Sequence, residues 1–454
     1  MTKAISAGPA WRSLVHVVRA VLDERLDSFT SAPLAVAFSG GGDSLALLLA
    51  ARAWASGARR PVLAITVDHR LQSAAADWAL WCEARARRLG VDHVTLAWAG
   101  EKPVAGLAAA ARAARHRLIA EAARVAGAHV VLMGHTADDL AEARVMRATD
   151  GVPSDPKTWS PSPAWPEGRG IFILRPLLGV RRAAIRAALA EAGETWIEDP
   201  ANSDPRHARA RARAMLGGSG EPDVGAPTPD MVPLLAQVRE GAGGELVVDR
   251  ELLRDAPRPV ARRLLAAAVL CASGVSRPPR GARLDRVLDR LALTGPFAGT
   301  LAGARVETDG LGRVTVSREA GEFERAGFLM IDLPVGRSVI WDGRLECSAR
   351  RPGLRLRPLD GDAARLPAAQ REARKRLAPA VRRALPALVD EAGQISCPIL
   401  AADPRAEVRS LVMARLAAAL GAVPSEAAIA SCGEHARNIL NGGLDVTRRV
   451  HEYP

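Results

Sequence analysis

Leu34 to Ser44 reads LAVAFSGGGDS, a short apolar run followed by a loop of serine and glycine. The apolar run Leu34 to Phe38 is typical of a buried strand, and the alanine- and leucine-rich segment that starts at Leu45 favours a helix. Between a strand and a helix N-terminus, glycines let backbone N–H groups approach an anion, and the helix dipole favours its charge. The stretch therefore predicts a βα unit that holds a nucleotide phosphate.

This loop differs from two common phosphate motifs. The chain contains no G-x-x-x-x-G-K-[ST] string, which excludes a Walker A loop. Ala46 and Leu47 stand where the dinucleotide fingerprint G-x-G-x-x-G would need another glycine. The sequence thus indicates a nucleotide site of another kind.

The alternation of strand and helix continues well beyond this unit. Further apolar runs lie at Val62 to Val67, His93 to Trp98, His129 to Met133 and Ile171 to Leu174, and helical Ala/Leu/Arg segments separate most of them. Such alternation predicts an α/β domain with a doubly wound, mostly parallel sheet. We interpret Ala148 to Gly170, rich in Pro, Ser and Trp, as a long loop.

Composition shifts suggest how the chain is divided. Gly217 to Pro229 reads GGSGEPDVGAPTP, which is typical of a linker. The predicted parts are an α/β domain over 1–216, a linker over 217–230, a helical middle domain with a hairpin over 231–327, and a small basic α+β domain over 328–454. In the middle part we expect helices at Met231 to Arg239, Pro259 to Ala272 and Ala282 to Leu293, and strands on both sides of the turn Asp309-Gly310.

Composition and charge narrow the class of protein. Of 454 residues, 48% are hydrophobic and 25% charged, as in globular proteins, and no uncharged apolar stretch reaches the length of a membrane helix. The N-terminal residues lack the unbroken apolar segment of a signal peptide, so we expect a cytoplasmic protein. Five scattered cysteines argue against a disulfide framework. The net charge is +12, and residues 350–383 alone hold eleven Arg or Lys against three acids, which predicts a polyanionic partner.

Ordered motifs carry a resemblance to a known family. SGGGDS resembles the PP-loop of the N-type ATP pyrophosphatases, whose fold is that of the adenine nucleotide α-hydrolases. The order of further motifs resembles the tRNA(Ile)-lysidine synthetases: V-D-H-R-L at 67–71, A-R-A-A-R-H at 111–116, G-H-T-A-D-D at 134–139, R-P-L-L at 175–178 and E-D-P-A-N-S-D at 198–204. Residues 300–318 and 352–401 resemble the later parts of that family more weakly.

The resemblance implies a ligase that modifies tRNA. It would join free lysine to C2 of the cytidine at the first anticodon position of tRNA(Ile) with a CAU anticodon, through an adenylated base. The reaction would use ATP and Mg²⁺, release AMP and pyrophosphate, and change codon reading from AUG to AUA. We expect no membrane partner, and the resemblance leaves a homodimer open.

Helical spacing and the resemblance together give the candidate site residues. Asp138 and Glu142, at i and i+4, would share one face of a helix capped by Thr136, and His135 and Asp139 would form a second such pair. The catalytic candidates are Asp43, Asp138, Asp139, Arg115 and His135, and the metal candidates are Asp43 and Glu142. ATP would contact Ser39, Gly40, Gly41, Gly42, Asp43, Ser44, Asp68, His69 and Arg112. RNA would contact Arg175, Asn202, Arg206, Arg209, Arg211, Arg213, Arg355, Arg357 and Lys375.

Two alternatives stay open at this point. One is another PP-loop enzyme, such as a tRNA thiolase or a small-molecule amidating enzyme, although sulfur transfer generally needs paired cysteines and Cys82 has no neighbour in sequence. The other is a tRNA-binding scaffold with a degenerate site, because Asp138 to Ala143 reads DDLAEA where the family usually has D-D-Q-x-E-T.

Overall fold

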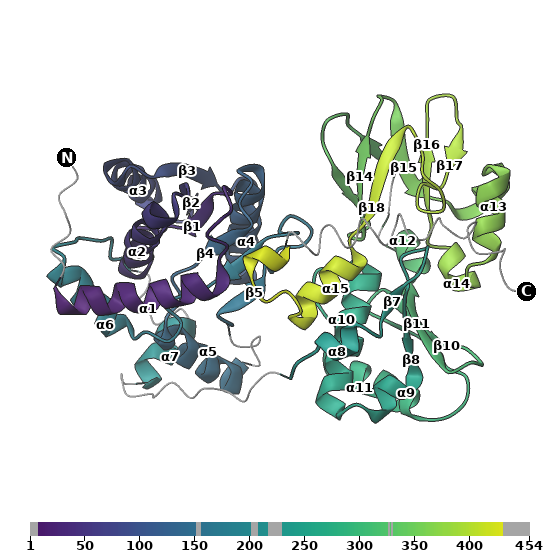
Figure 1. Cartoon of the computed structure of the whole chain (residues 1–454), viewed down its shortest axis with the longest axis horizontal. Coiled ribbons are helices and arrows are strands. Elements are labelled where there is room, and N and C mark those ends of the chain that lie inside the picture. The colour runs from purple at the N-terminus through teal and green to yellow at the C-terminus, as the bar shows by residue number, and fades with distance from the viewer. Residues whose placement is uncertain are drawn as a thin grey trace, which may run out of the picture. The chain divides into compact units, whose positions relative to one another are not determined.

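The computed structural model describes residues 8–150, 156–200, 208–216, 229–325, 327 and 330–429. They form two compact units (Figure 1): the first runs up to Pro227 and also takes in a short returning segment, described over 424–429, and the second runs from Thr228 to Val423. The expected middle domain and residues 330–423 of the expected C-terminal domain lie in the second unit, whereas residues 424–429 of that expected domain lie in the first. Their separation into two domains stays a prediction.

The first unit alternates strands and helices as expected. Its elements are α1 (Pro9–Arg25), β1 (Leu34–Ala37), α2 (Gly42–Ala58), β2 (Val62–Asp68), α3 (Ala75–Leu89), β3 (Asp92–Ala97), α4 (Leu107–Val125), β4 (Val130–Leu132), α5 (Ala137–Asp150), β5 (Trp159–Pro161), β6 (Phe172–Leu174), α6 (Arg182–Glu191) and α7 (Ala208–Leu216).

The topology of this sheet places the site. The strand order is β3-β2-β1-β4-β6-β5, and every pair is parallel except β5 with β6. Leu34, Val36 and Leu132 are buried at its centre, as expected for strands covered on both faces. The chain order reverses between β1 and β4, so the loops after these two strands meet at the carboxyl edge where such sheets bind ligands.

Strand β5 corrects the interpretation of Ala148 to Gly170 as a loop throughout. Trp159 pairs with Leu174 in antiparallel register, and its ring stacks on Phe172 with centroids 4.8 Å apart. Proline is tolerated on an edge strand because one side needs no ladder hydrogen bonds, so Pro161 does not prevent pairing. The Pro and Ser content of the segment concealed this strand.

The second unit combines helices with three antiparallel sheets. Its elements are α8 (Val232–Leu235), β7 (Arg239–Glu240), β8 (Leu246–Asp249), α9 (Arg250–Asp255), α10 (Arg258–Ser273), α11 (Ala282–Ala292), β9 (Ala298–Leu301), β10 (Ala304–Thr308), β11 (Arg313–Arg318), α12 (Gly321–Arg325), β12 (Ile331–Leu333), β13 (Val339–Trp341), β14 (Leu345–Ala349), β15 (Leu354–Pro358), the 3₁₀ helix η2 (Asp360–Arg365), α13 (Ala368–Lys375), α14 (Pro379–Arg382), β16 (Pro386–Val389), β17 (Ile395–Ser396), β18 (Ala406–Ser410) and α15 (Val412–Leu420).

The expected hairpin is present: β10 and β11 pair around Asp309-Gly310, with Thr308 opposite Val314. It belongs to a larger sheet than the sequence indicated, in the order β7-β8-β11-β10-β9. The expected helix at Met231 to Arg239 is shorter, because its last residue already pairs with Val247 as a strand. The other two sheets are β12-β15-β16-β17 and β13-β14-β18.

A late segment of the chain completes the first unit. The guanidinium of Arg60 donates to both carboxylate oxygens of Glu426, at 2.6 and 2.5 Å, and both side chains are almost fully buried. Arg25 donates to the carbonyl oxygen of Pro424 at 2.8 Å, and Ile429 packs on the core of this unit. Figure 1 draws this segment as the yellow helical turn near one end of α1.

Helices long and apolar enough to cross a membrane are absent from the described part of the chain.

Candidate functional site

The loop between β1 and α2 is held by its own serines. The backbone N–H of Ser39 donates to Oγ of Ser44 at 3.2 Å, and that hydroxyl donates to the carbonyl oxygen of Gly41 at 2.9 Å. Helix α2 begins at Gly42 without a side-chain cap, so N–H groups of its first turn can donate to a bound anion. This geometry supports a phosphate site over Ser39 to Ser44.

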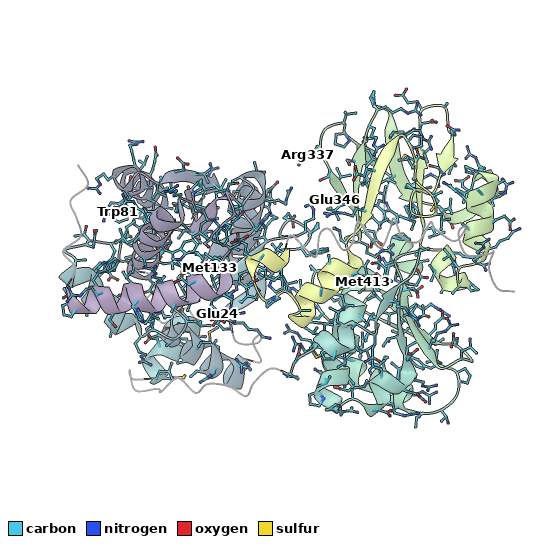
Figure 2. All side chains as sticks on the ribbon, viewed as in Figure 1. Glu24, Trp81, Met133, Arg337, Glu346 and Met413 are labelled. Atoms are coloured by element: carbon cyan, nitrogen blue, oxygen red, sulfur yellow. The ribbon has the colours of Figure 1, made fainter. Side chains whose placement is uncertain are left out.

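Two glycines let other loops approach this one. Gly40 has φ +81°, and a Cβ there would lie 2.4 Å from Cδ1 of Ile197, whose backbone N–H donates to the Gly40 carbonyl at 3.0 Å. Gly134 follows buried Met133, labelled in Figure 2, and a Cβ at Gly134 would lie 3.0 Å from the carbonyl of Asp43. The loop after β4 therefore packs on the first turn of α2.

Helix α5 begins with a reciprocal cap. Oδ2 of Asp139 accepts the backbone N–H of Thr136 at 2.8 Å and its hydroxyl at 2.9 Å, and the N–H of Asp139 points back to Thr136 Oγ1 at 3.4 Å. This is a capping box with Asp in the place of Glu. It fixes the carboxylate of Asp139 at the edge of the phosphate loop.

Arg182, which the sequence analysis missed, gathers three carboxylates. Its Nε lies 3.1 Å from Oδ2 of Asp43, its Nη2 3.5 Å from Oδ2 of Asp139, and its Nη1 3.3 Å from Oε1 of Glu142. The motif R-P-L-L ends only four residues earlier, so the arginine pair at 181–182 beside it was the available signal. One cation thus lies where three acidic groups from α2 and α5 converge.

Asp138 contacts the same arginine differently from the expected pairing with Glu142. Its Oδ2 accepts the backbone N–H of Arg182 at 2.7 Å, and its Oδ1 lies 3.4 Å from Arg181. The guanidinium of Arg182 instead joins Glu142 to Asp139 and Asp43. Asp138 therefore caps α6, while the other three form the acidic cluster.

The charges of this cluster shift one another. Burial raises the pKa of Asp43 above its ordinary value, although Arg182 acts in the opposite direction. Burial alone would lower the pKa of Arg182, but the carboxylates of Asp139 and Asp43 outweigh it and raise that pKa. The guanidinium of Arg182 thus stays charged, and its charge offsets only part of the rise that burial causes in the pKa of Asp43.

Glu142 has capacity for a further cation. Its side chain is 1% exposed, and Oε1 accepts from Nε of Arg213 at 2.8 Å as well as from Arg182. Oε2 is buried and has no hydrogen-bond partner among the described residues. Because a buried carboxylate oxygen without a partner is costly, this atom is a natural ligand for a metal ion or an ammonium group.

A second, basic group of side chains surrounds His116. His116 is buried, neither ring nitrogen has a hydrogen-bond partner in the structure, and burial with Arg115 and Arg112 lowers its pKa to about 2. Arg175 donates to Nδ1 of His135 at 3.3 Å. The candidates Arg112, Arg115 and His135 therefore belong to one electropositive region.

Arg175 corrects one expected RNA contact. Its side chain is buried and donates to the carbonyl oxygen of Lys157 at 2.7 Å and to Oγ of Ser160 at 3.1 Å. Burial, then Arg112, lowers its pKa to about 10. The guanidinium of Arg175 uses its donors on His135 and on residues in and next to β5, and therefore positions them. Because it is buried, it is poorly placed to reach an RNA phosphate.

Asp68 and His69 lie at the carboxyl end of β2, as expected. Oδ1 of Asp68 accepts the N–H of Arg70 at 2.8 Å, and the rings of His69 and Trp98 are perpendicular, with centroids 6.0 Å apart. Burial and then Arg115 lower the pKa of His69. Asp68 and Arg70 line a shallow, open pocket of about 600 Å³.

Of the arginines after the E-D-P motif that were expected to contact RNA, only Arg211 and Arg213 have described side chains. Asn202 and Arg206 lie outside the described residues, as does the side chain of Arg209. Arg211 and Arg213 belong to helix α7, where residues two apart point to nearly opposite sides. Arg213 turns to Glu142 in the acidic cluster, so it belongs to the site itself.

The basic candidates of the second unit differ in their pairing. Arg357 is bound to Asp362, and Lys375 lies 2.7 Å from Glu372. Arg355 is exposed on β15 and makes no ion pair with a described residue. Part of the formal excess of positive charge at 350–383 is therefore neutralised by acidic side chains of the same segment.

Two comparisons with known proteins match a part of the chain. The family model described as a PP-loop domain matches residues 14–218. A solved structure of the U34-tRNA thiolase NcsA from Methanococcus maripaludis, with its [4Fe-4S] cluster, is similar over 46% of this chain and 72% of that chain, at 14% identity and a TM-score of 0.38.

Curated relatives cover more of the chain. A tRNA(Ile)-lysidine synthase of Caulobacter vibrioides is 49% identical over 416 residues, which are 90% of this chain and 98% of the relative. That of Hyphomonas neptunium is 34% identical over 66% of this chain and 85% of the relative. At this identity and coverage, the chain belongs to the tRNA(Ile)-lysidine synthase family.

Proposed function

We propose that this protein is an ATP-dependent ligase that forms lysidine in tRNA. In the proposed reaction it joins free lysine to C2 of the cytidine at the first anticodon position of tRNA(Ile) with a CAU anticodon. The observation that carries the proposal is the convergence of Asp43, Asp139 and Glu142 beside an uncapped phosphate loop. In such a site, a bound cation would link these three carboxylates to the phosphates of ATP.

The proposed reaction has two steps. The cytidine O2 attacks the α-phosphorus of ATP and pyrophosphate leaves; the lysine ε-amine then attacks C2, and AMP leaves with the former O2. The N–H groups of the first turn of α2 would bind the departing pyrophosphate, and Arg112 and Arg115 would neutralise charge near the α-phosphate. The protein works by positioning and charge neutralisation, without a covalent nucleophile.

Mg²⁺ fits the donor set of the acidic cluster. Asp43 and Glu142 would hold it, since carboxylate oxygens are its preferred ligands and Oε2 of Glu142 has no partner. No three His, Cys, Asp or Glu side chains of the described chain are grouped as a metal site on their own. Magnesium commonly completes its shell with substrate phosphates and water, and it would supply charge neutralisation here.

The attacking amine needs a place and a proton acceptor. Only a neutral amine is nucleophilic, so its proton must pass to a base before attack. Asp139 and Asp138 stand at the start of α5, next to Arg182. We propose that one of these carboxylates orients the ε-amine and accepts its proton. His135, at the same end of α5, would provide a neighbouring polar contact.

A thiolase is the main alternative, and the cysteines disfavour it. The cysteines of the described residues, Cys82, Cys271, Cys347 and Cys397, are all buried and form no disulfide, and Cys432 lies outside the described residues. Burial raises the pKa of Cys82 to about 11, and those of the other three to about 12. Thiols with such pKa values are largely protonated at neutral pH, which makes them poor sulfur nucleophiles.

Incubation with ATP, labelled lysine and two tRNA transcripts tests the proposal. The transcripts differ only in C or U at the first anticodon position. Label in the C transcript alone, with one AMP released per lysine, is the expected result. Label in neither transcript, or sulfur incorporation from a sulfide donor, would contradict it.

A further inference from the structure

Helix α11 of the second unit carries an arginine row on its outer face. Leu284, Leu288 and Leu291 are buried in the core, which fixes the rotation of the helix. Arg283, Arg286 and Arg290, at i, i+3 and i+7, are exposed on the other side. With a rise of about 1.5 Å per residue, the row spans about 10 Å.

The acids of the same helix do not neutralise this row. Asp285 lies 2.7 Å from Arg262, and Asp289 lies 2.6 Å from Arg258, both of α10. Among described residues, none forms an ion pair or a side-chain hydrogen bond with the guanidinium groups of the arginine row. The helix thus presents three uncompensated positive charges on one face.

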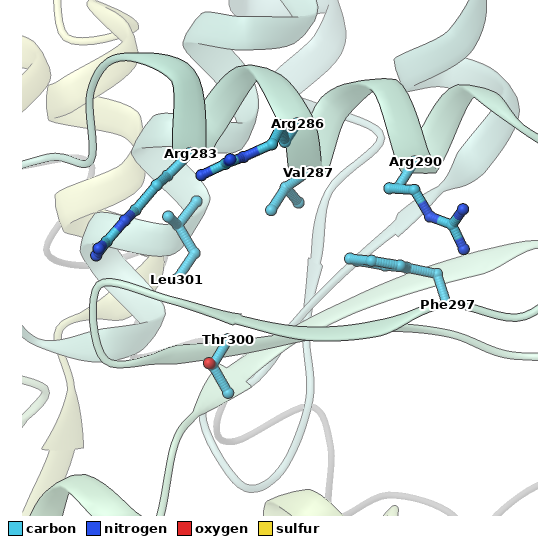
Figure 3. Close-up of a pocket in the computed structure, with 7 residues that line it drawn as sticks. All are labelled: Arg283, Arg286, Val287, Arg290, Phe297, Thr300 and Leu301. Carbon is cyan, nitrogen blue, oxygen red and sulfur yellow. The ribbon is translucent and has the colours of Figure 1, made fainter.

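An apolar floor lies beneath the arginine row. The row, Val287, Phe297, Thr300 and Leu301 line a pocket of about 310 Å³. Figure 3 shows Val287, Leu301 and the ring of Phe297 in the space between α11 and the strand, with the arginines along the helix. The pocket therefore offers cations and a flat ring side by side.

The ring of Phe297 is held in place by its surroundings. Its backbone N–H donates to Oγ1 of Thr308 at 2.7 Å, and its carbonyl accepts the N–H of Thr308 at 2.9 Å. The ring lies over Gly299, where a Cβ would come within 2.8 Å of Cζ. Phe297 is half-buried and lines the pocket, so part of its fixed ring remains accessible there.

This combination matches an RNA strand. Guanidinium groups bind phosphates bidentately, and bases stack on fixed aromatic rings in unpaired RNA. A second copy of the same face would bring three arginines against three arginines, which disfavours a two-fold interface here. Charge complementarity therefore favours a polyanion with flat rings over another copy of this chain.

We propose that the pocket between α11 and β9 binds an unpaired segment of the tRNA substrate, with phosphates on Arg283, Arg286 and Arg290 and a base on Phe297. The identity of the RNA as tRNA rests on the proposed function. The pocket lies in the second unit, away in sequence from the phosphate loop and from the basic segment 350–383. It adds affinity for RNA and leaves ATP binding to the first unit.

A charge-matched pair of variants tests the arginine row in the full chain. The triple variant Arg283→Gln, Arg286→Gln, Arg290→Gln removes the row. The control Arg254→Gln, Arg313→Gln, Arg325→Gln removes the same charge from exposed arginines that each have a local carboxylate partner. Binding of tRNA is measured over a series of KCl concentrations, and ATP binding is measured in parallel.

The row variant should bind tRNA at least tenfold more weakly at low salt. Its slope of log affinity on log salt should flatten by about 2, because each phosphate that the protein no longer neutralises reduces the slope by about 0.7. The control should keep nearly the wild-type slope. ATP affinity should be unchanged in both. Equal slopes for the row variant and wild type would overturn the proposal.

Phe297→Leu separates stacking from charge, because it keeps an apolar side chain and removes the ring. It should weaken tRNA binding about fivefold to tenfold without changing the salt slope. An unchanged affinity would remove Phe297 from the site. Polyglutamate binding that depends on the arginine row, with tRNA binding unaffected, would assign the pocket to an acidic protein and overturn the proposal.

The same measurements keep the two proposals distinct. If wild-type protein transfers lysine to tRNA and the row variant binds tRNA like wild type, this inference fails and the ligase assignment stands. If no lysine is transferred but RNA binding depends on the row, the ligase assignment fails and the RNA site stands.

Discussion

Arg182 and the arginine row of α11 carry the same side chain in opposite surroundings. Arg182 meets Asp43, Asp139 and Glu142 within 3.5 Å, whereas no described carboxylate pairs with the row. A paired arginine organises groups of its own protein, and an unpaired one remains available to a ligand. Counting charges along the sequence cannot distinguish the two cases.

The basic segment 350–383 lies between these extremes. Arg357 and Lys375 have acidic partners, and Arg382 donates to the carbonyl oxygen of Leu377 at 2.8 Å. On α11 the net charge is only +1, from three Arg against two Asp, yet the positive groups share one face. Whether each arginine already has an acidic partner therefore says more about an RNA-binding surface than the net charge of the segment does.

Removing a carboxylate from the most buried arginine pair should have the largest effect on stability. Glu426→Gln leaves the charge of Arg60 buried without a counterion, which should lower the free energy of unfolding by about 3–5 kcal/mol. Urea denaturation measures it, with Glu24→Gln as an exposed control. A loss below about 1 kcal/mol would mean that this pair resembles a surface contact.

Arg182→Met should come next, because it unpairs the acidic cluster. We expect a loss of about 3 kcal/mol, smaller than for Glu426→Gln since Arg213 still contacts Glu142. Arg186→Met, one turn later with both partners about half exposed, should cost under about 1 kcal/mol. If Arg182 occupies a cation site, Mg²⁺ should raise the melting temperature of Arg182→Met more than that of wild type.

Asp43→Asn tests the catalytic side of the cluster and should slow pyrophosphate release by about 100-fold without unfolding the protein. Asp77→Asn is the control, since Asp77 is an exposed acid in the first turn of α3. Because burial raises the pKa of Asp43, wild-type activity should fall on acidification at a pH above the ordinary value of 3.8. Pyrophosphate release at the wild-type rate would remove Asp43 from the mechanism.

Placing an acid within the arginine row should give the smallest change. Val287→Glu lies at i+4 from Arg283 and i−3 from Arg290, so it converts unpaired arginines into paired ones. Affinity for tRNA should drop about tenfold relative to Val287→Gln, while thermal stability changes little. Equal affinities of the two variants would show that pairing does not control RNA binding here.

Much of the first unit was predictable because its signals are local. A five-residue apolar run or a glycine loop carries its own periodicity, so β1, β2, β3, β4 and β6 were identified to within a residue or two. The reciprocal cap at Thr136 was equally local. Strand β5 was missed because an edge strand tolerates the proline and serine that usually indicate a loop.

The partners of side chains were much less predictable. Arg175 and Arg182 lie seven residues apart in one motif region, yet one supports His135 and the other joins three carboxylates. The sequence predicted that Arg213 contacts RNA, whereas in the structure its guanidinium on α7 forms an ion pair with Glu142. Such contacts join residues 40 to 140 positions apart, and no periodicity encodes them.

The returning segment ties the first unit to the order of protein synthesis. A ribosome completes residues up to 216 long before it adds Glu426, so Arg60 must wait for its counterion through some two hundred further residues. Until then the phosphate loop belongs to a unit that holds an uncompensated cation. We therefore expect the first unit to reach its full stability only after the second unit has been translated, and a chain terminated before Glu426 should have a less stable nucleotide-binding unit.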